Sequence, residues 1–213
     1  MPMEAHGGQR QKGTPVPSFA TLGPEGSNHE LVTQNYLSFH GLTTADVILV
    51  NDFLQALDLL VADRVDHIIQ VAVHPSTTEI VARAYFQHKV YLVDTFIAPS
   101  HPLAVLTRVE VDVPRTLALQ PATKAYVDTS RWHTMVPEIS TATVANGLLE
   151  GRYDSGIARA DLADRYPGRF RIDTLIGTID DPWLVYGKMR TCEGPLLAWK
   201  DSPMWRMLRK GAS

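Results

Sequence analysis

The sequence predicts an α/β fold in which the strands are mostly parallel. Short apolar runs rich in Val, Ile and Leu alternate with amphipathic segments along most of the chain. Most of the amphipathic segments begin at a hydroxyl or carboxyl side chain, as helices commonly do. This alternation is typical of parallel sheets, because a parallel connection needs a crossover that is usually a helix.

The predicted strands are short and apolar, as strands buried on both faces of a parallel sheet tend to be. In chain order they cover residues 18–22, 47–50, 68–73, 90–95, 116–119, 155–158 and 183–186.

The predicted helices lie between these strands. Ser27 and Ser76 each precede a Glu by three residues, the spacing of a capping box in which hydroxyl and carboxylate satisfy free backbone N–H groups. Asp52 has a Gln at the same spacing, Ser140 offers a further hydroxyl start, and Gly151 a stop. The helices are expected over residues 30–40, 53–62, 77–86, 121–131, 141–150 and 160–166.

The composition excludes several classes of protein. Hydrophobic residues make up 45% and charged residues 20% of the 213 residues, which excludes wholesale disorder, collagen-like repeats and coiled coils. A net charge of -3 offers no basic field for nucleic acid. No apolar run approaches the roughly 20 residues that span a bilayer. The single cysteine, Cys192, and the scattered histidines indicate neither a disulfide nor a metal site, so we expect no metal.

The two ends of the chain differ from the rest. Residues 1–17 contain Gly, Pro and polar residues without the apolar segment of a signal peptide, and we expect a flexible tail on a cytoplasmic protein. Residues 189–213 form a C-terminal extension with apolar and basic residues. We expect a short amphipathic helix there that packs on the body or on a second subunit.

Four strand-to-helix junctions lie at residues 21–30, 73–79, 119–124 and 139–144. Ligands of open α/β sheets bind at the carboxyl ends of strands, where helices begin. Helix N-termini present N–H groups and partial positive charge, which suit anions. The junctions therefore predict a cleft for a small-molecule carboxylate. Ordinary helix capping explains the same side chains and stays open as an alternative.

Three titratable side chains at these junctions are candidate catalytic residues: Glu25, His29 and His74. Each also has a structural interpretation: Glu25 as an exposed turn residue, His29 as a surface residue of a helix, and His74 as a histidine held in a turn. Trp183 is either a wall of a ring pocket or a core residue. The candidate binding residues are Thr21, Gly26, Ser27, Asn28, Pro75, Ser76, Thr77, Thr123, Ser140, Thr141 and Trp183.

The motif TLGPEGS at residues 21–27, directly after a strand, resembles the opening motif of prephenate dehydratases. The resemblance continues in order from residue 19 to 188. Ser-Thr-Ala at 140–142, Gly-Ile-Ala at 156–158 and Leu-Ala-Asp-Arg-Tyr at 162–166 are similar to blocks that the family carries in this order.

The departures from the family are as informative. Dehydratases carry a Thr-Arg-Phe triplet whose threonine assists departure of the ring hydroxyl, and this chain reads DDPWLVYGK at residues 180–188 instead. Because only about 25 residues follow residue 188, we expect no counterpart of the family's regulatory ACT domain. The opening motif and the Trp-x-x-x-Gly-Lys ending at 183–188 resemble the short prephenate decarboxylases of bacilysin-type pathways.

The resemblance implies a fold of two lobes like that of type II periplasmic binding proteins, with the site between them. Lobe one would cover about residues 18–88 and 183–188, and lobe two about 90–179. The resemblance also implies a homodimer. Decarboxylation of prephenate needs no cofactor in principle, because the ring diene accepts the electrons.

The predicted function is non-aromatising decarboxylation of prephenate or a closely related cyclic acid in specialised, antibiotic-type metabolism. An acid at the ring hydroxyl would release water and give an aromatic ring, whereas a proton delivered to carbon leaves the ring non-aromatic. Three alternatives remain. They are a true prephenate dehydratase, a dehydratase-like tailoring enzyme for another ring acid or thioester of a tropone-type pathway, and a non-catalytic ligand-binding protein.

Overall fold

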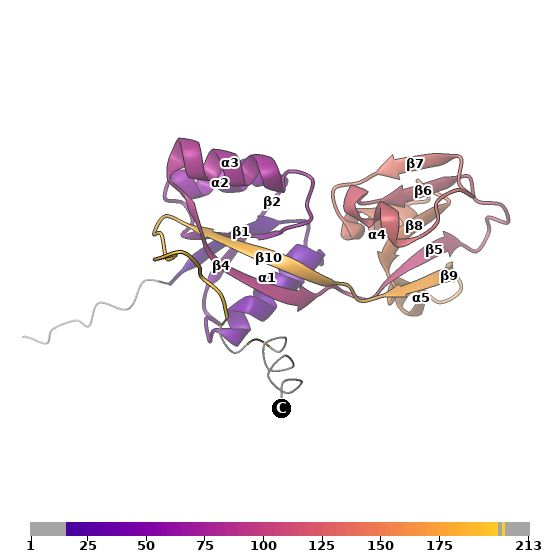
Figure 1. The fold of residues 1–213 in the computed structure, drawn as a ribbon. Coiled ribbons are helices and arrows are strands. Elements are labelled where there is room, and N and C mark those ends of the chain that lie inside the picture. Colours follow the sequence, from indigo (N-terminus) through magenta and orange to yellow (C-terminus); the bar gives the residue numbers. More distant parts are fainter. Residues whose placement is uncertain (1–15, 200–201, 203–213) are drawn as a thin grey trace, which may run out of the picture.

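The structure, a computed structural model, describes residues 16–199 and 202 and has two lobes that lie side by side (Figure 1). Each lobe is built on one five-stranded sheet. The strand order is β2-β1-β3-β10-β4 in the sheet of lobe 1 and β7-β6-β8-β5-β9 in that of lobe 2. This is the α/β, two-lobed architecture that the sequence predicts.

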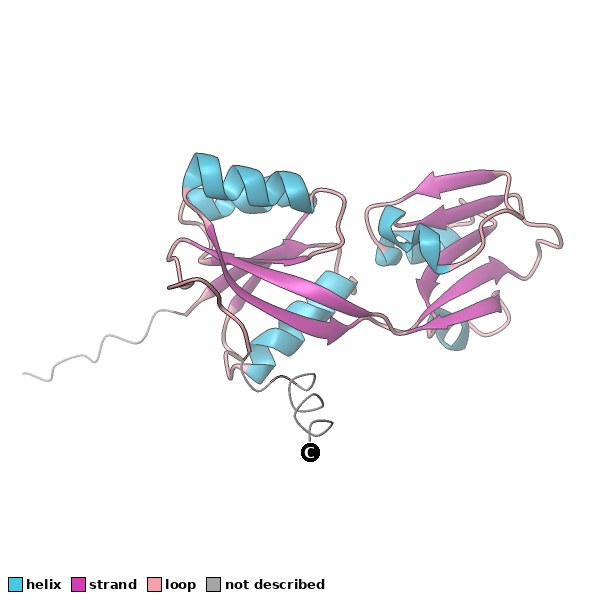
Figure 2. Cartoon of the chain, viewed as in Figure 1, coloured by secondary structure: helices cyan, strands magenta, loops and turns pink. Residues whose placement is uncertain are grey.

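Lobe 1 is a three-layer sandwich. Its strands are β1 (Ser18–Leu22), β2 (Asp46–Val50), β3 (His67–Val71), β4 (Tyr91–Pro99) and β10 (Asp180–Gly187). Helices α2 (Phe53–Val61) and α3 (Thr77–His88) cover one face of the sheet and α1 (Asn28–Phe39) the other (Figure 2). Successive apolar residues of a strand alternate between these faces. Ala20 packs into the cluster under α2 and α3, and Phe19 into the one under α1.

Lobe 2 has the same kind of layers. Its strands are β5 (Leu103–Arg108), β6 (Thr116–Leu119), β7 (Thr134–Pro137), β8 (Ser155–Arg159) and β9 (Phe170–Gly177). Its helices are η1, a 3-10 helix (Pro121–Tyr126), α4 (Thr141–Leu149) and α5 (Leu162–Arg165). A Cβ at Gly156 would come within 2.5 Å of Val144 Cγ1, so glycine lets α4 pack closely on β8.

The chain crosses between the lobes twice, and the two crossing segments are hydrogen-bonded to each other. The Ser100 N–H donates to the carbonyl of Ile179 at 2.9 Å, and the Ile179 N–H donates to Ser100 Oγ at 3.0 Å. We expected lobe two to begin near residue 90. Strand β4 instead pairs with β10 from Tyr91 to Pro99, which keeps it in lobe 1.

The strands are not mostly parallel. Strand β1 is parallel to β2 and β3, and β6 to β7 and β8, but β10 is antiparallel to β3 and β4, and β5 to β8 and β9. The prediction was wrong because β5 and β10, the first strand after each crossing between the lobes, are antiparallel to both of their neighbours. Strands β5, β7 and β9 were not predicted. Strand β9 alternates polar and apolar residues as an edge strand does, and β7 is a short edge strand that ends in Pro137.

The predicted helix starts are confirmed except at one. The side chains of Ser27, Asp52 and Ser140 each accept a hydrogen bond from the backbone N–H three residues on. The predicted stop is also confirmed, since Gly151 adopts φ of 75° directly after Glu150, the C-cap of α4. Ser76 makes no side-chain cap, because its hydroxyl is bonded to the His74 ring.

The segment 121–131 was predicted as one helix and is a six-residue 3-10 helix, Pro121–Tyr126, followed by loop. Of the predicted tail, residues 1–15 lie outside the described residues. Residues 189–199 form neither helix nor strand, and the rest of the C-terminal extension, except residue 202, lies outside the described part. No helix within the described ranges has the length and apolar character to cross a membrane.

Candidate functional site

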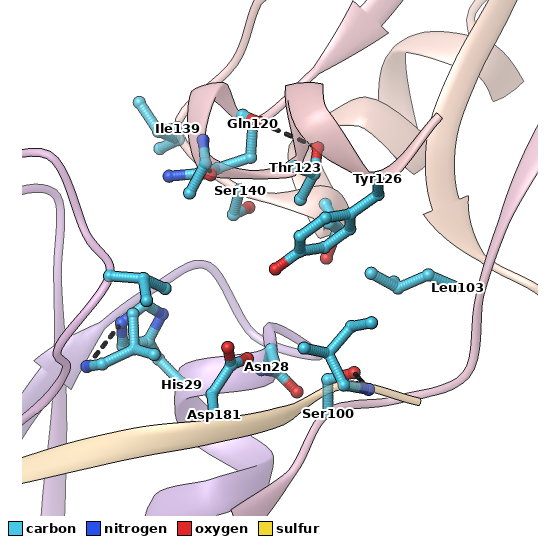
Figure 3. Close-up of a pocket in the computed structure, with 15 residues that line it drawn as sticks. Asn28, His29, Ser100, Leu103, Gln120, Thr123, Tyr126, Ile139, Ser140 and Asp181 are labelled. Carbon is cyan, nitrogen blue, oxygen red and sulfur yellow. Dashed lines mark hydrogen bonds between the residues drawn. The ribbon is translucent and has the colours of Figure 1, made fainter. Parts of the chain in front are cut away.

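A cleft lies between the two lobes, beside the crossing segments (Figure 3). Its cavity volume is about 70 Å³, well below the roughly 300–1,000 Å³ of common ligand pockets. A ring acid would therefore require the lobes to move apart about the crossing segments. The lining residues are Asn28, His29, Val71, Val73, Ser100, Leu103, Gln120, Ala122, Thr123, Tyr126, Ile139, Ser140, Thr141, Ile179 and Asp181.

Helix α1 begins at the lobe 1 wall of the cleft. Ser27 Oγ accepts from the Glu30 N–H at 3.1 Å and donates to the Leu22 carbonyl at 2.9 Å, so its hydroxyl is used within the turn. Asn28 reaches the cleft, and its Oδ1 accepts from the backbone N–H of His101 at 3.0 Å. This bond joins the start of α1 to a crossing segment and leaves the Asn28 amide hydrogens free to donate.

His29 lies on the same wall and is held neutral. Burial lowers its pKa to about 3, and a smaller effect from His74 acts in the same direction. The ring packs edge-on against Trp183, with centroids 5.1 Å apart, and near Phe53 at 5.4 Å. His29 Nε2 accepts from the Val71 N–H at 3.5 Å. A neutral ring cannot act as a charged acid near pH 7, so His29 serves the cleft as an apolar wall with one N–H donor.

His74 does not line the cleft. Its Nδ1 accepts from the Ser76 N–H at 3.2 Å and is bonded to the Ser76 hydroxyl at 2.8 Å. Its ring packs against Phe53, with centroids 5.0 Å apart. Burial lowers the pKa of His74 as well. These contacts fit the alternative interpretation, a histidine held in a turn.

Helix α4 begins at the lobe 2 wall. Ser140 Oγ accepts from the Thr143 N–H at 3.0 Å, which leaves the N–H groups of Thr141 and Ala142 as unpaired donors among the described hydrogen bonds. Thr141 is buried, lines the cleft, and its hydroxyl makes no hydrogen bond to any described residue. These donors and the positive end of the helix dipole suit a carboxylate.

The short helix η1 supplies the remainder of this wall. Gln120 Oε1 accepts from the Ala122 N–H at 2.7 Å, so its amide nitrogen remains available as a donor. Thr123 lines the cleft, but its hydroxyl donates to the Gln120 carbonyl at 2.8 Å. Lobe 2 thus offers neutral donors, and neither lobe places a Lys or Arg among the described lining residues.

Asp181 and Tyr126 approach the cleft from opposite lobes. Figure 3 shows the Tyr126 hydroxyl pointing toward lobe 1 and the Asp181 carboxyl pointing into the gap. Asp181 is only 8% exposed, and its carboxyl accepts no hydrogen bond from a described residue. Burial, and secondarily the charge of Asp180, raises the pKa of Asp181. Burial and the charge of Asp181 raise the pKa of Tyr126.

The structure brings five of the candidate residues to the cleft: Asn28, His29, Thr123, Ser140 and Thr141. The others lie elsewhere for identifiable reasons. Glu25 is exposed, Thr21 Oγ1 donates to the buried Ile69 carbonyl, and Trp183 is fully buried in the core under α1. The remaining candidates serve the turns themselves or lie outside the lining, and they are Gly26, Ser27, His74, Pro75, Ser76 and Thr77.

Sequence reasoning missed Asp181, Tyr126 and Gln120 as cleft residues. Asp181 lies two residues before Trp183 on β10, so both side chains share one face of the strand. A signal was available, since an acidic residue at the start of an apolar strand is unusual. Its place at the cleft, however, depends on β10 entering lobe 1 from the crossing. Among the described residues, no group of three or more His, Cys, Asp or Glu side chains could hold a metal ion.

Comparison with solved structures gives the fold. A prephenate dehydratase from Arthrobacter aurescens is 18% identical with a TM-score of 0.60, over 84% of this chain and 63% of that one. The Staphylococcus aureus prephenate dehydratase is 18% identical with a TM-score of 0.52, over 82% and 67%. An ABC transporter protein from Parabacteroides distasonis is 14% identical with a TM-score of 0.51, over 92% and 70%.

The chain therefore has the two-lobed fold found both in prephenate dehydratases and in a transporter protein, and it spans 63% of the length of the Arthrobacter chain. No protein-family model and no curated protein matches the sequence. The fold alone does not separate an enzyme from a binding protein, so the side chains that line the cleft have to do so.

Proposed function

We propose that the protein is a lyase that binds prephenate or a closely related cyclic acid between the lobes and removes carbon dioxide from it without aromatising the ring. The single observation that carries the proposal is the interlobe cleft, in which donors suited to a carboxylate face a buried carboxyl group. The chain has the fold of prephenate dehydratase structures. Its strand β10 reads Asp-Asp-Pro-Trp where the resemblance leads us to expect Thr-Arg-Phe in those enzymes. We place the reaction in specialised, antibiotic-type metabolism of the cytoplasm.

The start of α4 is the proposed carboxylate-binding element. Its unpaired N–H groups, the Thr141 hydroxyl and the Gln120 amide can donate to one carboxylate. The amide hydrogens of Asn28 can donate to a second carboxylate from lobe 1. Neutral donors suit a substrate that loses a charge, because they bind the carboxylate without the strong ground-state attraction of a Lys or Arg.

The apolar part of the cleft favours loss of carbon dioxide. Val71, Leu103 and Ile139 line it together with the neutral ring of His29. A carboxylate transferred from water to such surroundings is less stable, whereas the charge that spreads into the ring during decarboxylation is less penalised. Closure of the lobes over the substrate would exclude the remaining water.

A second candidate function, prephenate dehydratase, is favoured by one observation. Asp181 lies in the segment where the resemblance places the hydroxyl-expelling triplet, and it is a buried carboxyl group. Both reactions take up one proton for each prephenate dianion. The decarboxylase delivers it to a ring carbon, and the dehydratase delivers it to the ring hydroxyl, which leaves as water.

The test is incubation of the purified protein with prephenate, with the product mass and ultraviolet spectrum recorded against a control without protein at the same pH. Loss of carbon dioxide alone supports the proposal. Loss of carbon dioxide and water identifies a dehydratase. Unchanged prephenate that is bound saturably contradicts both and favours the ligand-binding function, whereas unchanged and unbound prephenate points to a tailoring enzyme for another ring acid. Native mass spectrometry of the same sample tests the proposed homodimer.

A further inference from the structure

We propose that Asp181 is the proton donor of this lyase, delivering its carboxyl proton to a carbon of the substrate ring as carbon dioxide leaves. The inference rests on the proposed function and deepens it. It starts from a carboxyl group that is more than nine-tenths buried, lines the interlobe cleft and has no hydrogen-bond partner among the described residues. Structural carboxyl groups that are buried to this degree are nearly always paired.

The neighbours of Asp181 explain why it would hold a proton. Strand β4 presents Ala98 opposite it in the ladder, and the adjoining Pro182 carbonyl accepts from the N–H of Ala72, directly after β3, so neither neighbour offers a cation. Across the cleft Tyr126 is a neutral hydroxyl, and on α1 His29 is a neutral ring. The only charge nearby on its own strand is Asp180, which repels a second negative charge.

The position of Asp181 also fits the substrate. A ring acid whose carboxylate rests at the start of α4 lies between the lobes, so its ring faces the lobe 1 wall formed by His29 and Asp181. Binding a second carboxylate nearby would further favour the protonated form of Asp181. The Tyr126 hydroxyl points at the same gap and can donate to the carboxylate that Asp181 becomes after the transfer.

The step balances in atoms and charge. The bond between the ring and the departing carboxylate breaks, its electron pair becomes a ring double bond, and the displaced double bond takes the Asp181 proton at carbon. The products are carbon dioxide and a non-aromatic hydroxy acid with one negative charge fewer than prephenate. Asp181 then regains a proton from water when the lobes open.

The decisive variant is Asp181→Asn, which keeps the size of the side chain and removes the acid. We expect its kcat with prephenate to fall by at least about 100-fold, as for loss of a general acid. At a pH below the Asp181 pKa, the Kd for prephenate should change less than about threefold. Asp180→Asn is the matched control. It removes an exposed carboxylate from the adjacent position, and its kcat should stay within about threefold of wild type.

A second measurement does not depend on turnover. The affinity for phenylpyruvate, a ring acid whose charge is constant from pH 5 to 9, is measured by calorimetry across that range. Wild-type affinity should fall as pH rises through the Asp181 pKa, because the ionised carboxyl repels the ligand, and Asp181→Asn should bind independently of pH. Wild-type affinity that does not change with pH, or an Asp181→Asn variant with the kcat of wild type, overturns the inference about Asp181 but does not contradict the proposed lyase activity. A wild-type protein without turnover overturns the lyase and, with it, the reaction that Asp181 would serve.

Discussion

The two walls of the cleft are built alike and equipped differently. Each has a helix that starts at the cleft behind a capping serine, Ser27 for α1 and Ser140 for α4. The wall of lobe 1 then adds two groups that ionise in water, His29 and Asp181, and burial disfavours the charged form of both. Apart from Tyr126, the polar side chains that line the cleft from lobe 2 carry only hydroxyl and amide groups. We therefore propose that lobe 2 holds the charge of the ligand and that lobe 1 moves a proton.

The largest expected effect comes from placing a negative charge on the lobe 2 wall. Thr141→Asp puts a carboxylate among the N–H donors of α4, where it stabilises the helix and repels an acidic ligand. We expect phenylpyruvate affinity to fall about 100-fold by calorimetry, with an unchanged or slightly higher Tm.

Asn146→Asp is the control for this variant, since it adds the same charge at an exposed position of the same helix. It should bind as the wild type does. Equal affinities for Thr141→Asp and wild type would show that the lobe 2 wall does not hold the carboxylate.

Stability in acid should depend on lobe 1. The pKa of His29 is about 3 in the folded protein and near 6.5 when unfolded, so the unfolded state binds more protons between these values. Stability is therefore full above pH 6.5 and is lost as pH falls, by about 2 kcal/mol from His29 between pH 7 and 5. His74, whose pKa is also lowered, adds in the same direction. Urea unfolding at both pH values measures the loss.

His29→Gln tests the assignment of this loss, because its amide oxygen can still accept from the Val71 N–H and it does not titrate. The variant should lose less stability than the wild type between pH 7 and 5. An identical loss in both proteins would mean that the acid sensitivity arises elsewhere.

Tyr126→Phe separates binding from proton transfer. Loss of one neutral hydroxyl in the cleft should weaken phenylpyruvate binding about fivefold, in line with about 1 kcal/mol for a hydrogen bond. The dependence of affinity on pH should keep the shape found in wild type, because Asp181 remains. If the affinity of Tyr126→Phe did not change with pH, the group that titrates would be Tyr126 of lobe 2 and not Asp181 of lobe 1.

The smallest effect concerns stability without ligand. Asp181 has a raised pKa, so its contribution to stability is complete at low pH and is lost as pH rises through the folded value. Asp181→Asn removes the buried carboxylate that destabilises the folded protein at high pH. It should raise Tm at pH 8 by about 2 °C in a scanning calorimeter, with little change at pH 4. A lower Tm at pH 8 would instead indicate that the carboxylate is stabilised by its surroundings.

The sequence predicted local features of the fold better than the paths between its lobes. Serine and aspartate caps depend on neighbouring residues alone, and Ser27, Asp52 and Ser140 are where the pattern placed them. The cap predicted at Ser76 does not form, because the Ser76 hydroxyl is bonded to the ring of His74 instead. Capping patterns do not include such a contact. The antiparallel direction of β10 depends on its return from lobe 2, which is not encoded in the strand itself.

The same limit applies to the site. Asn28, His29 and Thr141 could be predicted, because strand-to-helix junctions of both lobes face the cleft. The sequence marks Asp181 only as an unusual acidic residue. The places of Asp181 and Tyr126 at the cleft could not be predicted, since these residues reach it from a strand start and from the end of a 3-10 helix. The charge state of His29 was also beyond the sequence, because it depends on packing against Phe53 and Trp183.

The position of β10 between β3 and β4 has a consequence for how the chain is made. Every strand of lobe 2 lies in the continuous stretch from Leu103 to Gly177, so that lobe can assemble as soon as the ribosome has released it. The sheet of lobe 1 lacks an inner strand until residues 180–187 emerge, although four of its strands are synthesised first. We expect the earlier half of the protein to be the later to mature, with β3 and β4 exposing unpaired edges to chaperones in the meantime.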